Sequence, residues 1–196
     1  TFADLQAVNP FVFGWITVYG TPIDYPMLQG EDNTKYVNTD PRGNYSLSGS
    51  IFLDCGSRKD FSDPVSILYG HDMAEGKMFG SLANFRDEEY FRAHRYGKLY
   101  YEGQWHGVEF FAFVETDAYD SAVYAPGTGA GELPAFAEGL CRKAENRRPA
   151  EVTEQDHLVL LSTCTDASTN GRHILAGKIS EQVEPDPFEE SGKEKQ

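Results

Sequence analysis

The sequence predicts a mainly β fold, a barrel or a sandwich, that carries a few helices. From Phe11 onward, short runs rich in β-branched and aromatic residues alternate with turn-forming residues, which is typical of these folds. Only two later segments show helical periodicity. The length of 196 residues suits one domain with one core, and the 40% hydrophobic content supports folding despite a formal net charge of -14.

The chain begins with a predicted short helix and continues through eight predicted strands. Leu5 and Val8 lie at helical spacing, and Pro10 should end this helix because proline is not tolerated in a helix interior. The strands are assigned to apolar runs between turn formers. In order they are Phe13–Tyr19, Ile23–Leu28, Ser50–Asp54, Val65–Tyr69, Lys98–Tyr101, Val108–Val114, His157–Ser162 and Arg172–Ile179.

Two segments between these strands have the periodicity of helices. In Lys77–His94, Met78, Leu82 and Phe85 recur at three- and four-residue steps, which predicts a helix that covers one face of a barrel. The second segment, Leu133–Arg147, has a proline near its first turn and basic residues near its end, where they favour the helix dipole. This helix is inserted between the sixth and seventh predicted strands.

Charge and composition divide the chain and exclude some partners. We expect a helical segment at 1–10, a β domain at 11–180 and an acidic, solvated tail at 181–196. The negative net charge would repel a phosphate backbone, so nucleic acid is not an expected partner. No apolar run approaches the ~18 residues needed to span a bilayer, and the start has no signal-peptide pattern. Any membrane anchor is expected outside this sequence.

Three cysteines, Cys55, Cys141 and Cys164, leave at least one thiol free and lack the close pairing of a zinc or redox motif. Cys164 closes the apolar run that starts at Leu158, so a buried strand should deliver its thiol to a polar loop. A nucleophile suits that position. A buried, inert cysteine is the alternative, and it is the commoner state of a free cysteine.

His71 and Arg172 are the other candidate catalytic residues. His71 follows the apolar run Val65–Gly70 at the end of another strand, and histidine exchanges a proton near neutral pH. Arg172 begins the next apolar run after Cys164, so a short loop can return it to the same rim. Its permanent positive charge is suited to stabilising an oxyanion, the negative charge that develops on a carbonyl oxygen during acyl transfer. A surface histidine and a surface salt bridge are the alternatives.

The segments around these three residues resemble the motifs of class B sortases, in the same order. Leu161-Ser162-Thr163-Cys164 resembles the nucleophile motif, Tyr69-Gly70-His71 the histidine segment, and Arg172-His173-Ile174-Leu175 the arginine strand. The similarity covers roughly nine-tenths of the chain. It extends through Gly14-Trp15-Ile16, Gly20-Thr21-Pro22-Ile23-Asp24-Tyr25-Pro26, Gln29-Gly30-Glu31-Asp32-Asn33, Gly49-Ser50-Ile51-Phe52-Leu53-Asp54 and Met78-Phe79.

The resemblance implies an eight-stranded sortase-type β-barrel with an N-terminal helix and a long helix between the sixth and seventh strands. It also implies a transpeptidase that needs no cofactor or metal. Cys164 would cleave a C-terminal sorting motif after threonine, Arg172 would hold the oxyanion and His71 would protonate the leaving amine. The acceptor would be an amine of a cell-wall precursor or of a pilin lysine. A monomer anchored at the extracellular face of the membrane is expected.

By the same resemblance, six residues are expected to contact the substrate. Asp166 is assigned although Thr165 stands directly after the nucleophile, where the family often has an acidic residue. For Asn33 a turn residue, and for Ser162 a strand residue facing solvent, are equally ordinary interpretations. The full set is Asn33, Tyr36, Tyr124, Ser162, Thr163 and Asp166.

Two other functions agree with the same residues. A cysteine protease would release the acyl group to water, and only the preferred acceptor separates it from a transpeptidase. A sortase-like scaffold with a silent thiol is the second alternative. It would bind or support other proteins without catalysis.

Overall fold

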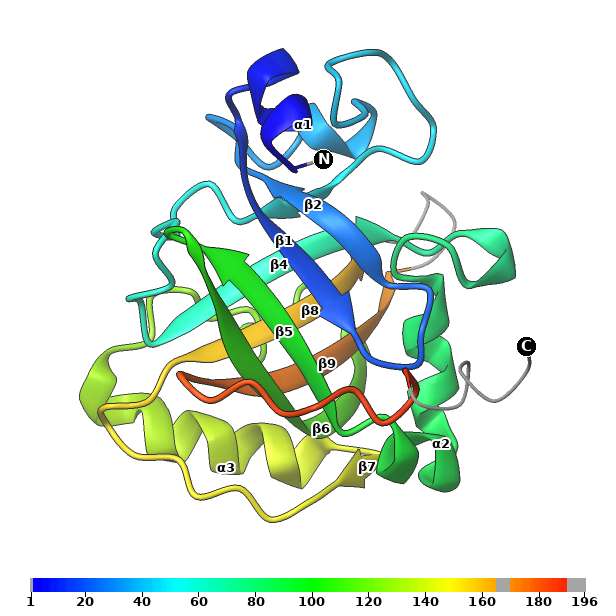
Figure 1. Cartoon of the computed structure of the whole chain (residues 1–196). Coiled ribbons are helices and arrows are strands. Elements are labelled where there is room, and N and C mark those ends of the chain that lie inside the picture. The colour runs from blue at the N-terminus through cyan, green and yellow to red at the C-terminus, as the bar shows by residue number, and fades with distance from the viewer. Residues whose placement is uncertain (1, 165–169, 190–196) are drawn as a thin grey trace.

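Eight strands close into a mixed β-barrel in this computed structural model, which describes residues 2–164 and 170–189 (Figure 1). The first four barrel strands are β1 (Val12–Val18), β2 (Asp24–Leu28), β3 (Ile51–Leu53) and β4 (Val65–His71). The other four are β5 (Tyr96–Tyr101), β6 (Gln104–Asp117), β8 (Leu158–Cys164) and β9 (Gly171–Ser180). A two-residue strand, β7 (Asn146–Arg147), pairs with β6 outside the barrel.

The strand order sets which ends of the strands meet. Neighbouring strands run β5-β1-β2-β3-β4-β8-β9-β6, and pairing of β5 with β6 closes the barrel. The pairs β2–β3 and β4–β8 are parallel, and the other pairs in the barrel are antiparallel. Because β4 and β8 are parallel neighbours, their C-terminal ends lie at the same edge of the sheet.

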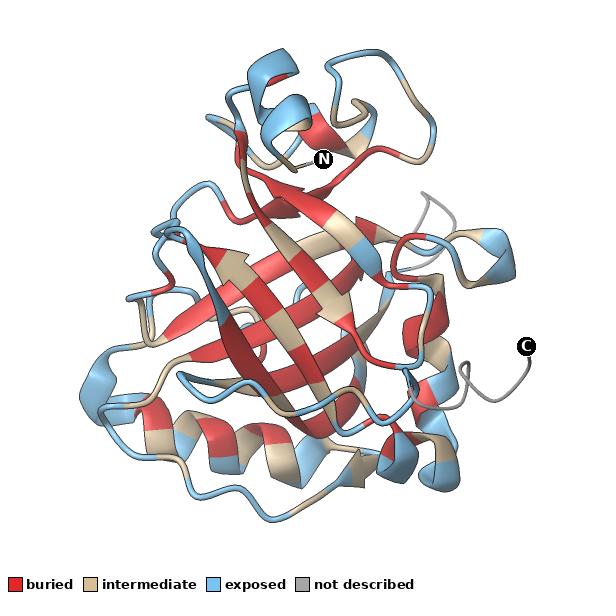
Figure 2. Ribbon diagram, viewed as in Figure 1, coloured by how far each residue is buried: buried red, intermediate tan, exposed pale blue. Residues whose placement is uncertain are grey.

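Short helices cover the barrel on several sides. The α-helices are α1 (Phe2–Val8), α2 (Glu88–Ala93) and α3 (Leu133–Lys143). The 3₁₀ segments are η1 (Lys35–Val37), η2 (Ala74–Gly76), η3 (Gly80–Arg86) and η4 (Ala130–Glu132). Helix α3 packs its buried residues, among them Leu133 and Leu140, against one outer face of the barrel (Figure 2).

Strand β8 is buried on both faces, which explains its continuous apolar sequence. Val159 and Leu161 belong to the cluster inside the barrel. Leu158 and Leu160 belong to the cluster between the barrel and α3. All four side chains have no exposed surface. A strand packed in this way fixes its own register, so Cys164 at its end is placed by the core behind it.

All eight predicted strands are confirmed, with small shifts of their bounds. The predicted N-terminal helix and the helix predicted from Leu133 are confirmed as α1 and α3. The continuous helix predicted for Lys77–His94 is wrong. The segment divides into η3 and α2 because Asp87 adopts an extended conformation (φ -73°, ψ 127°). Its side chain accepts a hydrogen bond from the Tyr90 amide and caps α2. Likewise α3 ends at Lys143, because Ala144 is extended before β7.

The segment predicted as a solvated tail contacts the barrel over its described part, residues 181–189. The Tyr19 hydroxyl donates to the Glu184 carbonyl at 3.0 Å. The Phe188 ring stacks on His94 with centroids 4.9 Å apart, and it also lies against Gly20. One aromatic side chain and one hydroxyl contact therefore hold this acidic segment to the barrel. Residues 190–196 lie outside the described part of the chain.

Candidate active site

The candidate catalytic residues meet through the register of three strands. In the parallel pair β4–β8, His71 is the register partner of Cys164. In the antiparallel pair β8–β9, the pairing ends with Ser162 facing Ile174, two residues before Cys164 and two residues after Arg172, so the same register continued along both strands would bring Arg172 level with Cys164. Adjacent strands lie about 4.8 Å apart. The main chain at these three positions therefore gathers at one edge, which we call the β4–β8 edge.

Gly70 allows β4 to continue as a paired strand up to this edge. A Cβ at Gly70 would lie 2.5 Å from the Ile51 side chain and 2.8 Å from the Phe79 ring. Any larger residue would push the strand away from this packing. The strand pairing with β8 continues through Gly70 to His71, so the glycine serves close packing rather than a turn.

The imidazole of His71 is half-buried and held by a backbone group. Its Nε2 lies 2.6 Å from the carbonyl oxygen of Val37, at the end of η1. A carbonyl only accepts hydrogen bonds, so Nε2 carries the hydrogen in the neutral ring. The other ring nitrogen, Nδ1, is then the one that can accept a proton. The contact fixes both the tautomer and the orientation of the ring.

Gly49 leaves the space that the Val37 carbonyl occupies. It has a positive φ of 57°, which glycine adopts without strain. A Cβ here would lie 2.5 Å from the Tyr36 carbonyl oxygen and closer still to that of Val37. The next amide, of Ser50, donates to the Tyr36 carbonyl at 2.9 Å. The backbone of η1 is thus clamped behind the histidine, a support that no sequence motif indicated.

Arg172 lies on the other side of Cys164 at the start of β9. Its guanidinium is part of a half-buried side chain and donates from Nη1 to the Gly171 carbonyl at 3.0 Å. Its main chain pairs with Thr116 of β6. Thr163 ties β9 to β8, because its hydroxyl accepts from the His173 amide at 2.9 Å. The side chain of Cys164 lies outside the described residues.

Three of the predicted substrate contacts are buried behind the edge. Thr163 and Ser162 have no exposed surface, and the Ser162 hydroxyl lies 2.7 Å from the hydroxyl of Tyr124. Tyr36 is 1% exposed and packs in the apolar cluster under α1, where its hydroxyl has no hydrogen-bond partner within the described residues. These three side chains therefore pack within the fold and present almost no surface to a ligand.

Asn33 is connected to the strand that carries His71. Its side-chain amide donates to Asp54 at 2.8 Å, and its side-chain oxygen accepts from the Cys55 amide at 2.8 Å. The same Asp54 oxygen accepts from the hydroxyl of Tyr69, two residues before His71, at 3.1 Å. Asn33 thus links a loop to β4. Of the two remaining predicted contacts, Tyr124 is half-buried and lies against Ser162, and Asp166 lies outside the described residues.

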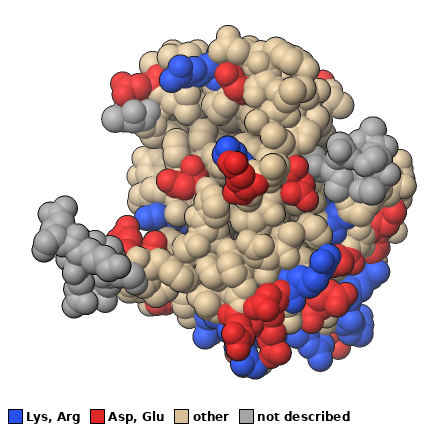
Figure 3. Space-filling model, turned by 90° about the vertical axis from the view of Figure 1, so that its right-hand side faces the viewer, with Lys and Arg blue, Asp and Glu red and all other residues tan. Residues whose placement is uncertain are grey.

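In Figure 3, charged side chains are scattered over the upper and middle parts of this side of the molecule, and basic and acidic side chains crowd together in its lower part. Among the described residues, no group of three or more His, Cys, Asp or Glu side chains could hold a metal ion. The described helices are all too short or too polar to cross a membrane.

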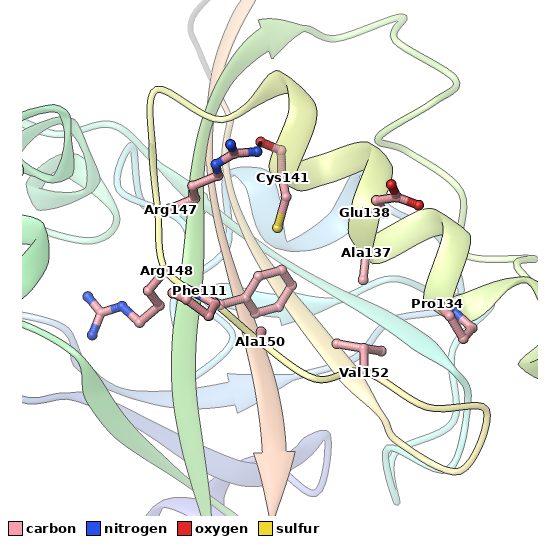
Figure 4. A pocket seen from close by; sticks show the side chains of 10 residues that line it. Phe111, Pro134, Ala137, Glu138, Cys141, Arg147, Arg148, Ala150 and Val152 are labelled. Atoms are coloured by element: carbon pink, nitrogen blue, oxygen red, sulfur yellow. Dashed lines mark hydrogen bonds between the residues drawn. The ribbon is translucent and has the colours of Figure 1, made fainter.

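Of the other two cysteines, Cys55 is exposed and Cys141 is half-buried. Cys141 lines a cavity of about 450 Å³ between α3 and β6, together with Phe111, Ala137 and Val152 (Figure 4). Burial raises the pKa of the Cys141 thiol. A raised pKa lowers the thiolate fraction and so disfavours Cys141 as a nucleophile.

Known proteins similar to this chain are sortases of class B. Sortase B of Listeria monocytogenes is 32% identical over 185 residues, which cover 90% of this chain and 72% of that protein. A class B sortase of Streptococcus pyogenes involved in pilus biogenesis is 39% identical, with a TM-score of 0.84 over 92% of this chain and 98% of that one. A sortase B–substrate complex of Staphylococcus aureus is 27% identical, with a TM-score of 0.85 over 92% and 84%. No protein-family model matches the chain.

Proposed function

Because the chain belongs to the class B sortase family, we propose that it is a transpeptidase whose catalytic residues are Cys164, His71 and Arg172. The supporting observation is the strand register. It sets His71 beside Cys164 on a parallel pair, and β9, which carries Arg172 near its start, pairs with β8 on the other side. A thiol, a proton carrier and a permanent cation on three adjacent strands can act on one carbonyl.

In the first step, the Cys164 thiolate attacks the carbonyl carbon of a threonine in a sorting motif. Negative charge builds on the carbonyl oxygen, and the guanidinium of Arg172 stabilises it. The carbon–nitrogen bond then breaks, and protonated His71 gives its proton to the departing amine. A thioester to Cys164 remains. Because the Nε2 hydrogen of His71 is bound to Val37, Nδ1 is the atom that exchanges this proton.

In the second step, an acceptor amine attacks the thioester and loses a proton to His71. A new amide bond forms, and the thiolate of Cys164 leaves. The bond energy of the first amide is conserved in the thioester, so the exchange needs neither a nucleotide nor a metal ion. The acceptor is an amine of a cell-wall precursor or a pilin lysine. The similarity to a sortase involved in pilus biogenesis supports the pilin.

The substrate is a surface protein or pilin with a C-terminal sorting motif, and the similarity to a sortase B–substrate complex supports this. Asn33, Tyr124 and Asp166 are proposed to line the groove. The buried Tyr36, Ser162 and Thr163 would support it from behind. We propose that the enzyme acts as a monomer at the cell surface, anchored by a segment outside this sequence.

The test is turnover of fluorogenic peptides that carry candidate sorting motifs, with an added amine. Cys164→Ala should reduce turnover at least ~10³-fold, because only binding and oxyanion stabilisation remain. Cys55→Ala and Cys141→Ala are matched controls that remove the other thiols and should retain activity. Normal turnover by Cys164→Ala would refute the proposal.

The mass of the product separates transfer from hydrolysis. A transpeptidase should yield the peptide joined to the amine, and the yield should rise with amine concentration. A product with a free carboxylate at every amine concentration would indicate a cysteine protease instead. An enzyme without turnover, whose Cys164 also resists thiol reagents, would indicate the silent scaffold.

A further inference from the structure

The outer face of β1, β5 and β6 carries a row of three aromatic residues, which we call the aromatic face. Trp15 of β1 pairs with Tyr100 of β5, and Tyr100 pairs with Trp105 of β6. Register partners on adjacent strands point to the same side of the sheet, so the three rings stand in one line. The rings of Tyr100 and Trp105 have centroids 5.3 Å apart, and Trp105 is 40% exposed.

This row forms one wall of a cavity of about 490 Å³. Phe2 of α1 extends the wall, because its ring meets Tyr100 edge-on with centroids 5.2 Å apart. The segment 181–189 contributes Asp186 and Glu189 to the lining. Figure 1 shows β1 and β5 side by side beneath α1, with this segment running along the barrel below them. None of the lining residues belongs to the β4–β8 edge.

The charged groups of the cavity are mostly carboxylates. Asp24 of β2 uses one carboxylate oxygen to accept from the Trp15 indole at 2.7 Å and from the Thr17 hydroxyl at 2.9 Å. Its second oxygen stays available for a donor from a ligand. Asp186 and Glu189 add two more carboxylates. A ligand that suits this lining must bring donors and, since three carboxylates face one lysine, positive charge.

The single basic side chain in the lining shows how a cation sits here. The ammonium of Lys98 lies 4.5 Å from the centre of the Trp105 ring and 5.8 Å from that of Tyr19. Cations are attracted to the faces of aromatic rings, most strongly to tryptophan. The cavity therefore already accommodates one ammonium group on its aromatic wall.

The charges around Tyr19, which lies near Lys98, are negative, as expected for a site that binds a cation. Burial raises the pKa of Tyr19, and Asp186, Glu189 and Glu184 raise it further because their charges oppose a phenolate. The same charges favour a cation close by. A saccharide would stack on the rings as well, but its hydroxyls need donors and acceptors together. The Trp15 indole and the Thr17 hydroxyl already donate to Asp24, so the Tyr100 hydroxyl, the Trp105 indole and the Lys98 ammonium are the further donors of the lining. Three carboxylates against one ammonium favour a cation over a neutral saccharide.

We propose that the cavity of the aromatic face binds a lysine or arginine side chain of a basic segment in a partner protein. The aromatic wall holds the alkyl stem and the cationic head, and Asp24, Asp186 and Glu189 bind its donors. This site is separate from the proposed catalytic residues and does not depend on them.

The chain has two tryptophans, and both line this cavity, so intrinsic fluorescence reports on the site. The probe is a short peptide with three lysines, titrated into the whole protein at low salt. The matched control peptide has norleucine in place of each lysine. We expect saturable quenching by the lysine peptide that weakens as salt screens the carboxylates, and none by the control.

Three variants separate a cation site from a general disturbance of the fold. Asp24→Asn keeps the oxygen that accepts from Trp15 and removes the charge, so it should weaken binding several-fold. Lys98→Gln removes the competing cation and should strengthen binding several-fold. Glu89→Gln removes an exposed carboxylate of α2 and should leave binding unchanged. Opposite effects at two lining positions are not expected from a structural defect.

Several results would overturn the proposal. Equal quenching by the norleucine peptide would make the cavity an apolar groove. Quenching by N-acetylglucosamine, without a response to lysine, would make it a saccharide site. A fluorescence change that depends on protein concentration alone would assign the face to self-association. Unchanged affinity of both Asp24→Asn and Lys98→Gln would show that the cavity does not recognise charge.

Discussion

The β4–β8 edge and the aromatic face are built in different ways on the same barrel. At the edge, main-chain atoms fix the candidate residues: strand register aligns Cys164 with His71, and a backbone carbonyl holds the imidazole. On the aromatic face, strand register also aligns the three rings, but a ligand would meet side chains and not main-chain groups, and the outermost ring, Trp105, is 40% exposed. The first arrangement suits chemistry that needs fixed geometry, and the second suits binding that tolerates adjustment.

This difference predicts that substitutions at the β4–β8 edge reduce stability and activity more than substitutions on the aromatic face. The largest effect is expected at Gly49, where alanine would take an unfavourable positive φ and would press on the carbonyls of Tyr36 and Val37. We expect Gly49→Ala to lower the free energy of unfolding by about 2–4 kcal/mol. It should also displace the acceptor of His71 and so reduce turnover of sorting peptides. Guanidinium denaturation and the peptide assay measure the two effects.

Gly43 provides the matched control for that variant. It also has a positive φ, 89°, but a Cβ there would meet no atom within 4 Å. Gly43→Ala should therefore cost only about 1–2 kcal/mol and leave turnover unchanged. Equal losses of stability and activity in both variants would mean that the close packing of η1 against Gly49 does not support His71.

The same difference explains how much the sequence revealed. Cys164, His71 and Arg172 stand at the ends of apolar runs, and strand ends can be recognised without knowing which strands pair. The aromatic row could not be recognised, because Trp15, Tyr100 and Trp105 become neighbours only through the register of three strands. Tertiary pairing of this kind leaves no local pattern in a sequence.

Local hydrogen bonds account for the other differences between the sequence-based predictions and the structure. The apolar spacing from Lys77 to His94 predicted one helix, but the side chain of Asp87 caps a new helix in its middle. Side chains such as aspartate bind nearby amides, and periodicity does not register this. The support of His71 by Val37 was equally hidden, because a backbone carbonyl can come from any residue.

A smaller loss of stability is expected when the contact between two hydroxyls behind the edge is removed. Tyr124→Phe removes the 2.7 Å contact to the Ser162 hydroxyl, which is buried, and should lower the free energy of unfolding by about 1 kcal/mol. Tyr119→Phe is the control in the same loop, since Tyr119 is 82% exposed and should change stability by less than about 0.5 kcal/mol. Urea denaturation compares them. Indistinguishable variants would show that buried hydrogen bonds do not reinforce the edge.

The smallest effect on stability is expected from a substitution of His106, which lies behind the aromatic face. This residue follows Trp105 on β6 but is buried, and its ring stacks on Tyr101 with centroids 3.8 Å apart. Burial lowers the pKa of His106 and outweighs the opposing influence of backbone hydrogen bonds, Glu102 and Glu181. The folded protein therefore binds this proton less readily than the unfolded chain.

The sign of the pH dependence follows from that lowered pKa. Above the ordinary histidine pKa of about 6.5 both states are neutral and the full stability is present. As the pH falls below that value, the unfolded chain takes up the proton first, and stability is lost. His106→Phe keeps a stacked ring without a titrating group, so its free energy of unfolding should fall less between pH 7.5 and 5 than that of the wild type. Parallel curves would mean that His106 is solvated, and that the aromatic face lacks a dry layer beneath its exposed rings.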